Sequence, residues 1–108
     1  MIAIKKMLGY IQTHYSEKIS LQNIATAGAV CRSKCCTLFI NTLKKTPIEY
    51  LTNYRIQKSI DFMTNYNLNI TDIATACGFN SSNYFAETFK RIQGVSPSEY
   101  RKTISYFM

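Results

Sequence analysis

Apolar residues recur along this chain at spacings of three and four, which is the repeat of a helix with one buried face. Near the N-terminus this spacing predicts an amphipathic helix with apolar positions at Ile4, Met7, Leu8, Ile11 and Tyr15. No segment shows the sustained alternation of apolar and polar residues that is typical of a half-buried strand. The pattern therefore predicts an all-α chain with about seven helices.

One block of the pattern occurs twice. The Ile-Ala-Thr-Ala of residues 24–27 recurs at residues 73–76, and the Pro-x-Glu-Tyr of residues 47–50 recurs at residues 97–100. Ordered matches at a nearly constant offset indicate two copies of one supersecondary unit. Each copy predicts a short helix, a tight turn, a longer helix and a further helix that proline opens at its first turn.

Capping residues mark where the two short helices begin. Ser20 and Asn69 are suitable N-caps, because their side-chain oxygens can accept a bond from a free backbone N–H of the first turn. In the second copy Gly78 suits a turn that needs positive φ. The first copy has Ala29 there, preceded by Gly28, so its turn is less clearly defined.

The longer helices are expected at residues 32–43 and 82–93, and each has an apolar face. The predicted core positions are Cys35, Leu38, Phe39 and Thr42 in the first copy and Phe85, Thr88, Phe89 and Ile92 in the second. Residues 47–65 predict one linker helix of about 25 Å. Its apolar contacts are expected from Ile48, Leu51, Tyr54, Arg55, Ile56, Ser59, Phe62 and Met63. The first lobe then spans residues 1–46, and the second spans residues 66–108.

The net charge favours a polyanionic partner. Thirteen Lys and Arg residues outweigh six Asp and Glu residues, which gives +7 at pH 7, and such a balance suits nucleic acid or an acidic membrane surface. No apolar run approaches the roughly 20 residues of a membrane span. The N-terminal residues lack the apolar centre of a secretory signal. We therefore expect a cytoplasmic chain with no membrane partner.

The residue types that carry catalysis or bind metal have simpler explanations here. The spacing of Cys31, Cys35, Cys36 and Cys77 does not resemble paired zinc-binding arms, and cytoplasmic thiols are expected to be reduced. Cys31, Cys35 and Cys36 could form a redox or metal switch, but the simpler explanation, in which Cys35 packs in the core, is favoured. Because Glu49 and Glu99 occupy equivalent first-turn positions, stabilisation of helix dipoles accounts for them better than acid–base catalysis. No catalytic residue, metal site or cofactor is predicted.

Two helix-turn-helix units predict binding to double-stranded DNA, because such a unit offers its second helix to the major groove. Two recognition helices about 25–35 Å apart match successive major grooves, which are about 34 Å apart. The outward positions supply base-reading candidates, namely Ser33, Cys36, Thr37, Ser82, Asn83 and Glu87. The flanking bases supply phosphate candidates, namely Arg32, Lys34, Lys44, Lys45, Lys90 and Arg91. Ordinary solvated charge is an equally good account of Lys44-Lys45 and Lys90-Arg91.

The second copy resembles the C-terminal signature of the AraC/XylS transcription regulators. The matching residues are Ile73-Ala74, Cys77-Gly78-Phe79-Asn80, Tyr84-Phe85, Phe89-Lys90, Gly94, Ser96-Pro97 and Tyr100-Arg101. The resemblance covers nearly the whole chain. It implies a bacterial regulator that binds a promoter as two lobes and activates transcription through contact with RNA polymerase.

Some positions depart from the family pattern. Cys31 stands where a polar N-cap is usual, Cys35 where leucine is frequent, and Lys44 where glycine is common. Thr37 and Glu87 stand where several relatives carry a base-reading arginine. These departures leave the predicted fold intact and put the scheme of base contacts in doubt.

Two alternatives stay open from the residues alone. The first is a DNA-independent module that keeps the fold and binds another regulator or RNA polymerase. The second is a fragment of a DNA-repair methyl acceptor, which the absence of a four-cysteine zinc pattern disfavours. No effector-binding domain is evident in these residues, so a sensor or dimerisation domain is expected outside them unless the chain is a stand-alone regulator. Packing in the core and between the lobes, rather than stacking on bases, is expected for four tyrosines: Tyr50, Tyr54, Tyr84 and Tyr100.

Overall fold

The computed structural model describes residues 2–107, and its side chains are described through residue 104. Within these residues there are seven helices and no strands, as the sequence pattern predicts. Their bounds are α1 (Ile2–His14), α2 (Leu21–Ala27), α3 (Arg32–Leu43), α4 (Pro47–Asn65), α5 (Ile70–Ala76), α6 (Ser82–Gln93) and α7 (Pro97–Phe107).

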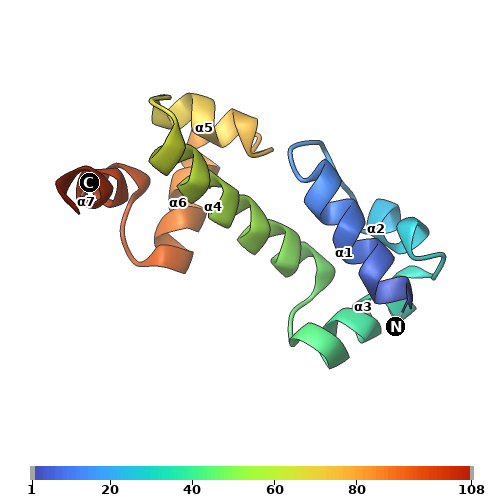
Figure 1. Cartoon of the computed structure of the whole chain (residues 1–108). Helices are drawn as coiled ribbons and strands as arrows, with labels where there is room; N and C mark the ends of the chain where they lie inside the picture. The colour runs from blue at the N-terminus through green and yellow to red at the C-terminus, as the bar shows by residue number, and fades with distance from the viewer. Residues whose placement is uncertain (1, 108) are drawn as a thin grey trace. The chain divides into compact units, whose positions relative to one another are not determined.

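The chain forms two compact units that divide between Tyr54 and Arg55, inside α4. Helices α1 to α3 and the N-terminal half of α4 make up unit 1, drawn from blue to green in Figure 1. The C-terminal half of α4 and helices α5 to α7 make up unit 2. None of the helices in the described part of the chain combines the length and hydrophobicity that a membrane crossing requires.

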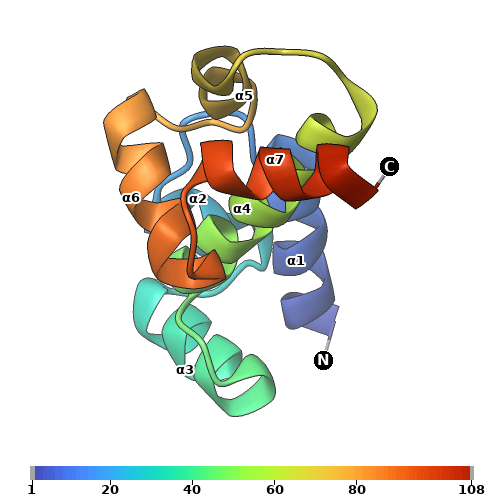
Figure 2. The ribbon, with the colours of Figure 1, turned by 90° about the vertical axis from the view of Figure 1, so that its left-hand side faces the viewer.

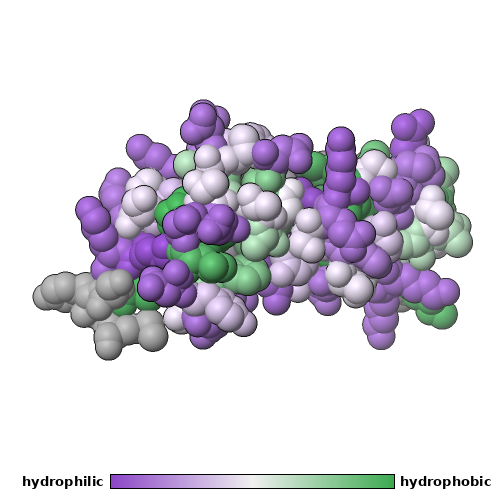
Figure 3. All heavy atoms as spheres, turned by 90° about the horizontal axis from the view of Figure 1, so that it is seen from above, coloured by the Kyte–Doolittle hydropathy of each residue, from purple (hydrophilic) through white to green (hydrophobic). Residues whose placement is uncertain are grey.

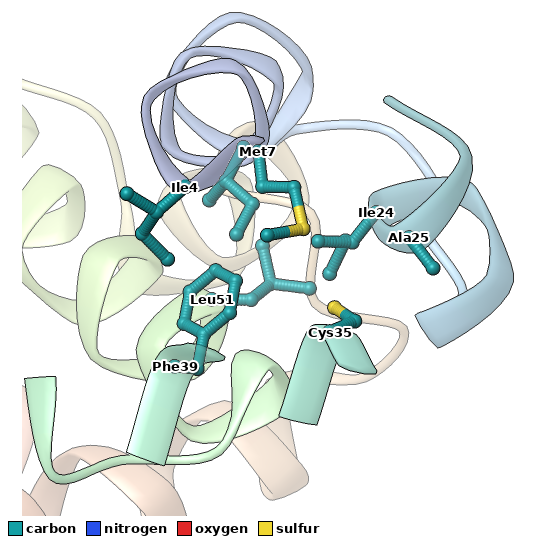
Figure 4. Packing of buried hydrophobic residues seen from close by; sticks show 8 residues of the cluster. Ile4, Met7, Ile24, Ala25, Cys35, Phe39 and Leu51 are labelled. Carbon is teal, nitrogen blue, oxygen red and sulfur yellow. The ribbon is translucent and has the colours of Figure 1, made fainter. Parts of the chain in front are cut away.

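The core of unit 1 draws between one and three buried side chains from each of its four helices. Met7 of α1, Ile24 of α2, Cys35 of α3 and Leu51 of α4 meet in the close view of Figure 4. Gly28, directly after α2, allows α1 to lie close, because a Cβ on it would come within 2.7 Å of the Met7 Cγ and 3.2 Å of a backbone oxygen of α1. Gly28 itself is buried.

Unit 2 is built around a chain of aromatic rings. The Phe85 ring lies 5.0 Å from Phe79 and 5.7 Å from Phe89, and Phe89 lies 5.5 Å from Tyr100 of α7 (centroid distances). Edge and tilted geometries at these distances are favourable for aromatic pairs. Through these rings, α6 is fixed to the turn before it and to α7, which Figure 2 shows in orange and red.

Three of the predicted packing positions are wrong. Thr42 is exposed, because Leu43, one residue on, packs against the core of unit 1 instead. Ile48 is 44% exposed, and Tyr84 is 54% exposed with its ring centroid 5.9 Å from that of Phe79. Tyr84 lies one position from the buried Phe85, about 100° around the helix, so its side chain leaves the core face.

Candidate nucleic-acid interface

In each unit a short helix, α2 or α5, is joined to a longer helix, α3 or α6, by the same kind of turn. In unit 1 the Ser20 hydroxyl accepts a hydrogen bond from the Asn23 backbone (3.1 Å) and the Asn23 side chain accepts one from the Ser20 backbone (2.9 Å). In unit 2 the Asn69 side chain accepts one from the Asp72 backbone (2.8 Å). The predicted N-caps of α2 and α5 are therefore confirmed.

The turn between the paired helices has the same backbone path in both units. The Val30 N–H donates to the Ala25 carbonyl at 3.1 Å, and the Phe79 N–H donates to the Ala74 carbonyl at 3.0 Å. The positive-φ position is Gly78 in unit 2 (φ 93°) and Ala29 in unit 1 (φ 57°). The first copy thus makes the turn without the glycine that normally relieves this conformation.

The longer helices also begin and end at equivalent residues. The Ser81 hydroxyl caps α6 by accepting from the Tyr84 backbone (3.1 Å), whereas Cys31 makes no side-chain bond at the start of α3. Both helices end in a left-handed residue, Lys44 with φ 60° and Gly94 with φ 88°. Unit 1 therefore has the same backbone with less favourable residues at both ends of α3.

Core packing fixes which sides of α3 and α6 face outward. Phe39 is fully buried in unit 1, as Phe85 and Phe89 are in unit 2. Of the base-reading candidates, Ser33, Thr37, Asn83 and Glu87 are exposed, and Cys36 and Ser82 are half-buried. The Thr37 hydroxyl donates its hydrogen to the Ser33 carbonyl (3.0 Å). Toward any further partner, the Thr37 oxygen therefore acts as a hydrogen-bond acceptor.

The six phosphate candidates are all exposed. Arg32 and Lys34 lie in the first turn of α3, Lys44 and Lys45 directly follow it, and Lys90 and Arg91 lie in the last turn of α6. Glu87 is the one acidic residue in α3 and α6. Hydrophilic residues cover much of the face in Figure 3, with smaller apolar areas between them. Two helices thus present polar side chains flanked by positive charge.

Comparison with known proteins identifies this arrangement. A family model described as a helix-turn-helix domain, of AraC/XylS type, matches residues 24–103. The chain belongs to the AraC/XylS family.

Individual relatives with known sequences are longer than this AraC/XylS chain. The chain is 42% identical over 99 residues to the uncharacterized HTH-type transcriptional regulator YdeC of Bacillus subtilis, covering 92% of this chain and 34% of YdeC. It is 29% identical over 99 residues to the melibiose operon regulatory protein of Escherichia coli, covering 92% of this chain and 33% of that protein. The chain thus spans about a third of these curated relatives.

A solved structure agrees with the AraC/XylS assignment. The C-terminal domain of AraT, a response regulator from Geobacillus stearothermophilus, superposes with a TM-score of 0.90 at 29% identity, over 95% of this chain and 86% of that one. The family fold therefore extends over nearly the whole chain.

Two exposed side chains of the AraC/XylS recognition helices escaped the sequence-based choice of site residues. Tyr84 occupies in α6 the position that Lys34 occupies in α3, and Ile40, 43% exposed, occupies in α3 the position of Lys90. The fifty-residue offset between the copies is enough to identify both positions from the sequence. Aligning the copies residue by residue shows an outward position in each case, whatever the residue type.

The remaining chemistry-bearing residues have structural surroundings. Burial lowers the pKa of Arg55, partly offset by the nearby Tyr84 and Cys77. The Glu49 carboxylate accepts from the Thr46 backbone (2.8 Å) at the start of α4, as expected for a first-turn acid. Among the described residues, no group of three or more His, Cys, Asp or Glu side chains is placed to hold a metal ion.

Proposed function

We propose that this chain binds duplex DNA with sequence specificity through α3 and α6 and so regulates transcription, as an activator. The observation that carries the proposal is the duplication within an AraC/XylS domain, with each copy exposing polar side chains beside cations. The DNA-binding domain of AdpA, whose structure contains a target DNA, has the same fold (TM-score 0.90, 19% identity, 95% of this chain and 93% of that one). The family is not an enzyme class, and we assign no catalytic step.

The side chains of the two helices suit different parts of the duplex. The Asn83 amide matches the donor and acceptor pair on the major-groove edge of adenine, and the Glu87 carboxylate can accept from the amino group of cytosine. Thr37 offers an acceptor to a base amino group. The cations at the helix ends suit phosphates, which position a protein on DNA without reading its sequence. We propose that α3 and α6 occupy successive major grooves.

A salt titration tests DNA binding directly. Six phosphate contacts predict a slope of about −5 for log affinity against log salt, which is roughly a thousandfold loss between 50 and 200 mM. Absence of duplex binding even at low salt rejects the proposal and favours a module that binds another regulator or RNA polymerase.

Two matched substitutions in α6 separate base reading from phosphate contact. Asn83→Ala is expected to remove about 1–3 kcal/mol of discrimination at one base pair. Lys90→Ala is expected to weaken binding to all sequences alike and to reduce the salt slope by about 1. Equal effects of both substitutions on specific and non-specific duplexes contradict the assignment of roles.

The larger setting follows from the relatives. Because the chain spans about a third of those relatives, we propose that a sensor or dimerisation domain outside these 108 residues receives the signal. Activation requires contact with RNA polymerase, which we propose as the protein partner. Both roles place the chain in the cytoplasm, where the chromosome lies.

A further inference from the structure

The four cysteines of this chain are free thiols that fall into two classes. Cys35 and Cys77 are fully buried, and burial raises the pKa of Cys35 to about 11 and that of Cys77 to about 12. Because the thiolate is the reactive form, these two are expected to be inert at neutral pH. Cys31 is exposed and Cys36 is half-buried, so the two cysteines that are not fully buried both lie at α3.

The Cys31 and Cys36 thiols lie at α3, which enters the major groove in the proposed function. Cys31 is the N-cap of α3 and its sulfur makes no capping hydrogen bond. Cys36 lies in the outward row with Ser33 and Thr37. Two exposed cations of the first turn, Arg32 and Lys34, lie one and three residues after Cys31 in the chain.

The duplication shows that neither thiol is needed to build a recognition helix. The equivalents of Cys31 and Cys36 in unit 2 are Ser81 and Ala86. Ser81 caps its helix, and Ala86 is a half-buried small residue on the same outward side. Unit 1 thus differs from unit 2 by carrying a thiol at both places.

We propose that Cys31 and Cys36 form a modification site at which a low-molecular-weight disulfide switches off DNA binding by unit 1. The inference rests on the proposed DNA-binding function. A cysteine thiolate attacks one sulfur of the disulfide, forming a protein mixed disulfide, and the other half leaves as a thiolate that takes up a proton. A second thiol reverses the exchange and regenerates the cysteine.

Two physical effects couple the adduct to loss of binding. The major groove is about 12 Å wide, and an α-helix with its side chains is about 10–12 Å across, so a tripeptide on the groove-facing side has no space. A glutathione adduct also adds net negative charge beside Arg32 and Lys34, where phosphate would otherwise lie. Both effects act on unit 1 alone.

The first test maps the adducts. The reduced full chain is incubated with glutathione disulfide and the modified peptides are identified by mass spectrometry. Adducts are expected on Cys31 and Cys36 and not on Cys35 or Cys77. Modification confined to the buried pair, or none under conditions that modify an unstructured cysteine peptide, overturns the proposal.

The second test measures binding to a duplex that the reduced chain selects from a random library. Modification is expected to weaken binding at least tenfold and dithiothreitol to restore it. At saturating protein, a hydroxyl-radical footprint is expected to lose protection over one half-site and keep it over the other. Complete modification with unchanged affinity and footprint contradicts the switch.

The matched control is the double variant Cys31→Ser/Cys36→Ala, which gives α3 the residues that α6 carries. Its affinity before treatment can differ from that of the natural chain, so the compared quantity is the ratio of affinities after and before glutathione disulfide. This ratio is expected to stay near one, with circular dichroism confirming the fold. A double variant that loses as much affinity as the natural chain overturns the assignment. Failure of the reduced natural chain to bind any duplex rejects the DNA-binding function itself, and the switch with it.

Discussion

The start of α3 makes a sharp prediction about stability, because α3 lacks a cap that its counterpart has. Ser81 accepts a hydrogen bond from the Tyr84 backbone at 3.1 Å, and Ser20 and Asn69 cap the short helices in the same way. Cys31 has the extended backbone of an N-cap (φ −76°, ψ 167°) and makes no such bond. The substitution Cys31→Ser therefore places a good acceptor where the backbone is already suited to it.

The expected gain follows from the usual worth of an N-cap. Replacing a capping serine by a non-capping residue typically costs about 1 kcal/mol, within a range of about 0.5–2 kcal/mol. Cys31→Ser is expected to stabilise unit 1 by about that amount, which is roughly a 4–8 °C rise in Tm for a domain of this size. Ser81→Ala is the matched reverse change and is expected to destabilise unit 2 by a similar amount.

Amide hydrogen exchange read by mass spectrometry distinguishes the two units. Cys31→Ser is expected to slow exchange about fivefold in α3 peptides wherever exchange proceeds through opening of unit 1, because about 1 kcal/mol corresponds to that factor. Ser81→Ala is expected to speed exchange in α6 peptides. Unchanged exchange in α3, together with the expected effect in α6, refutes the claim that the missing cap weakens α3.

Three further predictions concern backbone strain, close packing and pH. Gly94→Ala is expected to lower the urea midpoint by an amount equivalent to about 1 kcal/mol, because φ is +88° while the added Cβ meets nothing within 4 Å; an unchanged midpoint argues against the strain. Gly28→Ala is expected to cost about 1–3 kcal/mol in thermal unfolding, since its Cβ lies within 2.7 Å of the buried Met7 Cγ; a neutral effect shows that α1 gives way freely. Burial raises the pKa of Cys77 from 9.0 to about 12. Its contribution to stability is therefore complete below pH 9 and is lost as the pH rises toward 12, at up to about 1.4 kcal/mol per pH unit. Cys77→Ala is expected to flatten the decline between pH 9 and 11, and an equally steep decline contradicts the pKa shift.

The sequence pattern was sufficient for the helix bounds, because two copies constrain each other. The predicted ranges 32–43, 47–65 and 82–93 coincide with α3, α4 and α6. Prolines at equivalent places open α4 and α7, and the apolar spacing shows which sides of α3 and α6 are buried. When a pattern occurs twice in one chain, an error in the helix bounds assigned to one copy appears as a mismatch with the bounds assigned to the other.

The departures from prediction arise where packing overrides local preference. Ala29 and Lys44 adopt positive φ although neither is glycine, because the core of unit 1 imposes the backbone path that Gly78 and Gly94 follow in unit 2. Thr42 satisfies the helical spacing, but the larger apolar side chain of Leu43 reaches the core instead. Helical spacing places a position on a face and does not decide which of two neighbouring side chains fills the space.

The candidate site was predictable to the extent that outward position follows from core position. All six cations and four of the six base-reading candidates are exposed. Tyr84 was not predicted as a site residue because it was expected to pack in the core, and Ile40 was not predicted because its side chain has no hydrogen-bonding or charged group. The first copy carries cysteines where the second carries Ser81 and Ala86, so we expect the two recognition helices to contribute unequally.

Selection of duplexes from a random library, followed by footprinting of the enriched sequence, tests the proposed function most directly. We predict two conserved half-sites with centres about one helical turn apart, the half-site bound by α6 more strongly specified than that bound by α3. Enrichment of a single half-site, with Asn83→Ala leaving its sequence unchanged, contradicts the account, as does a library from which nothing is enriched.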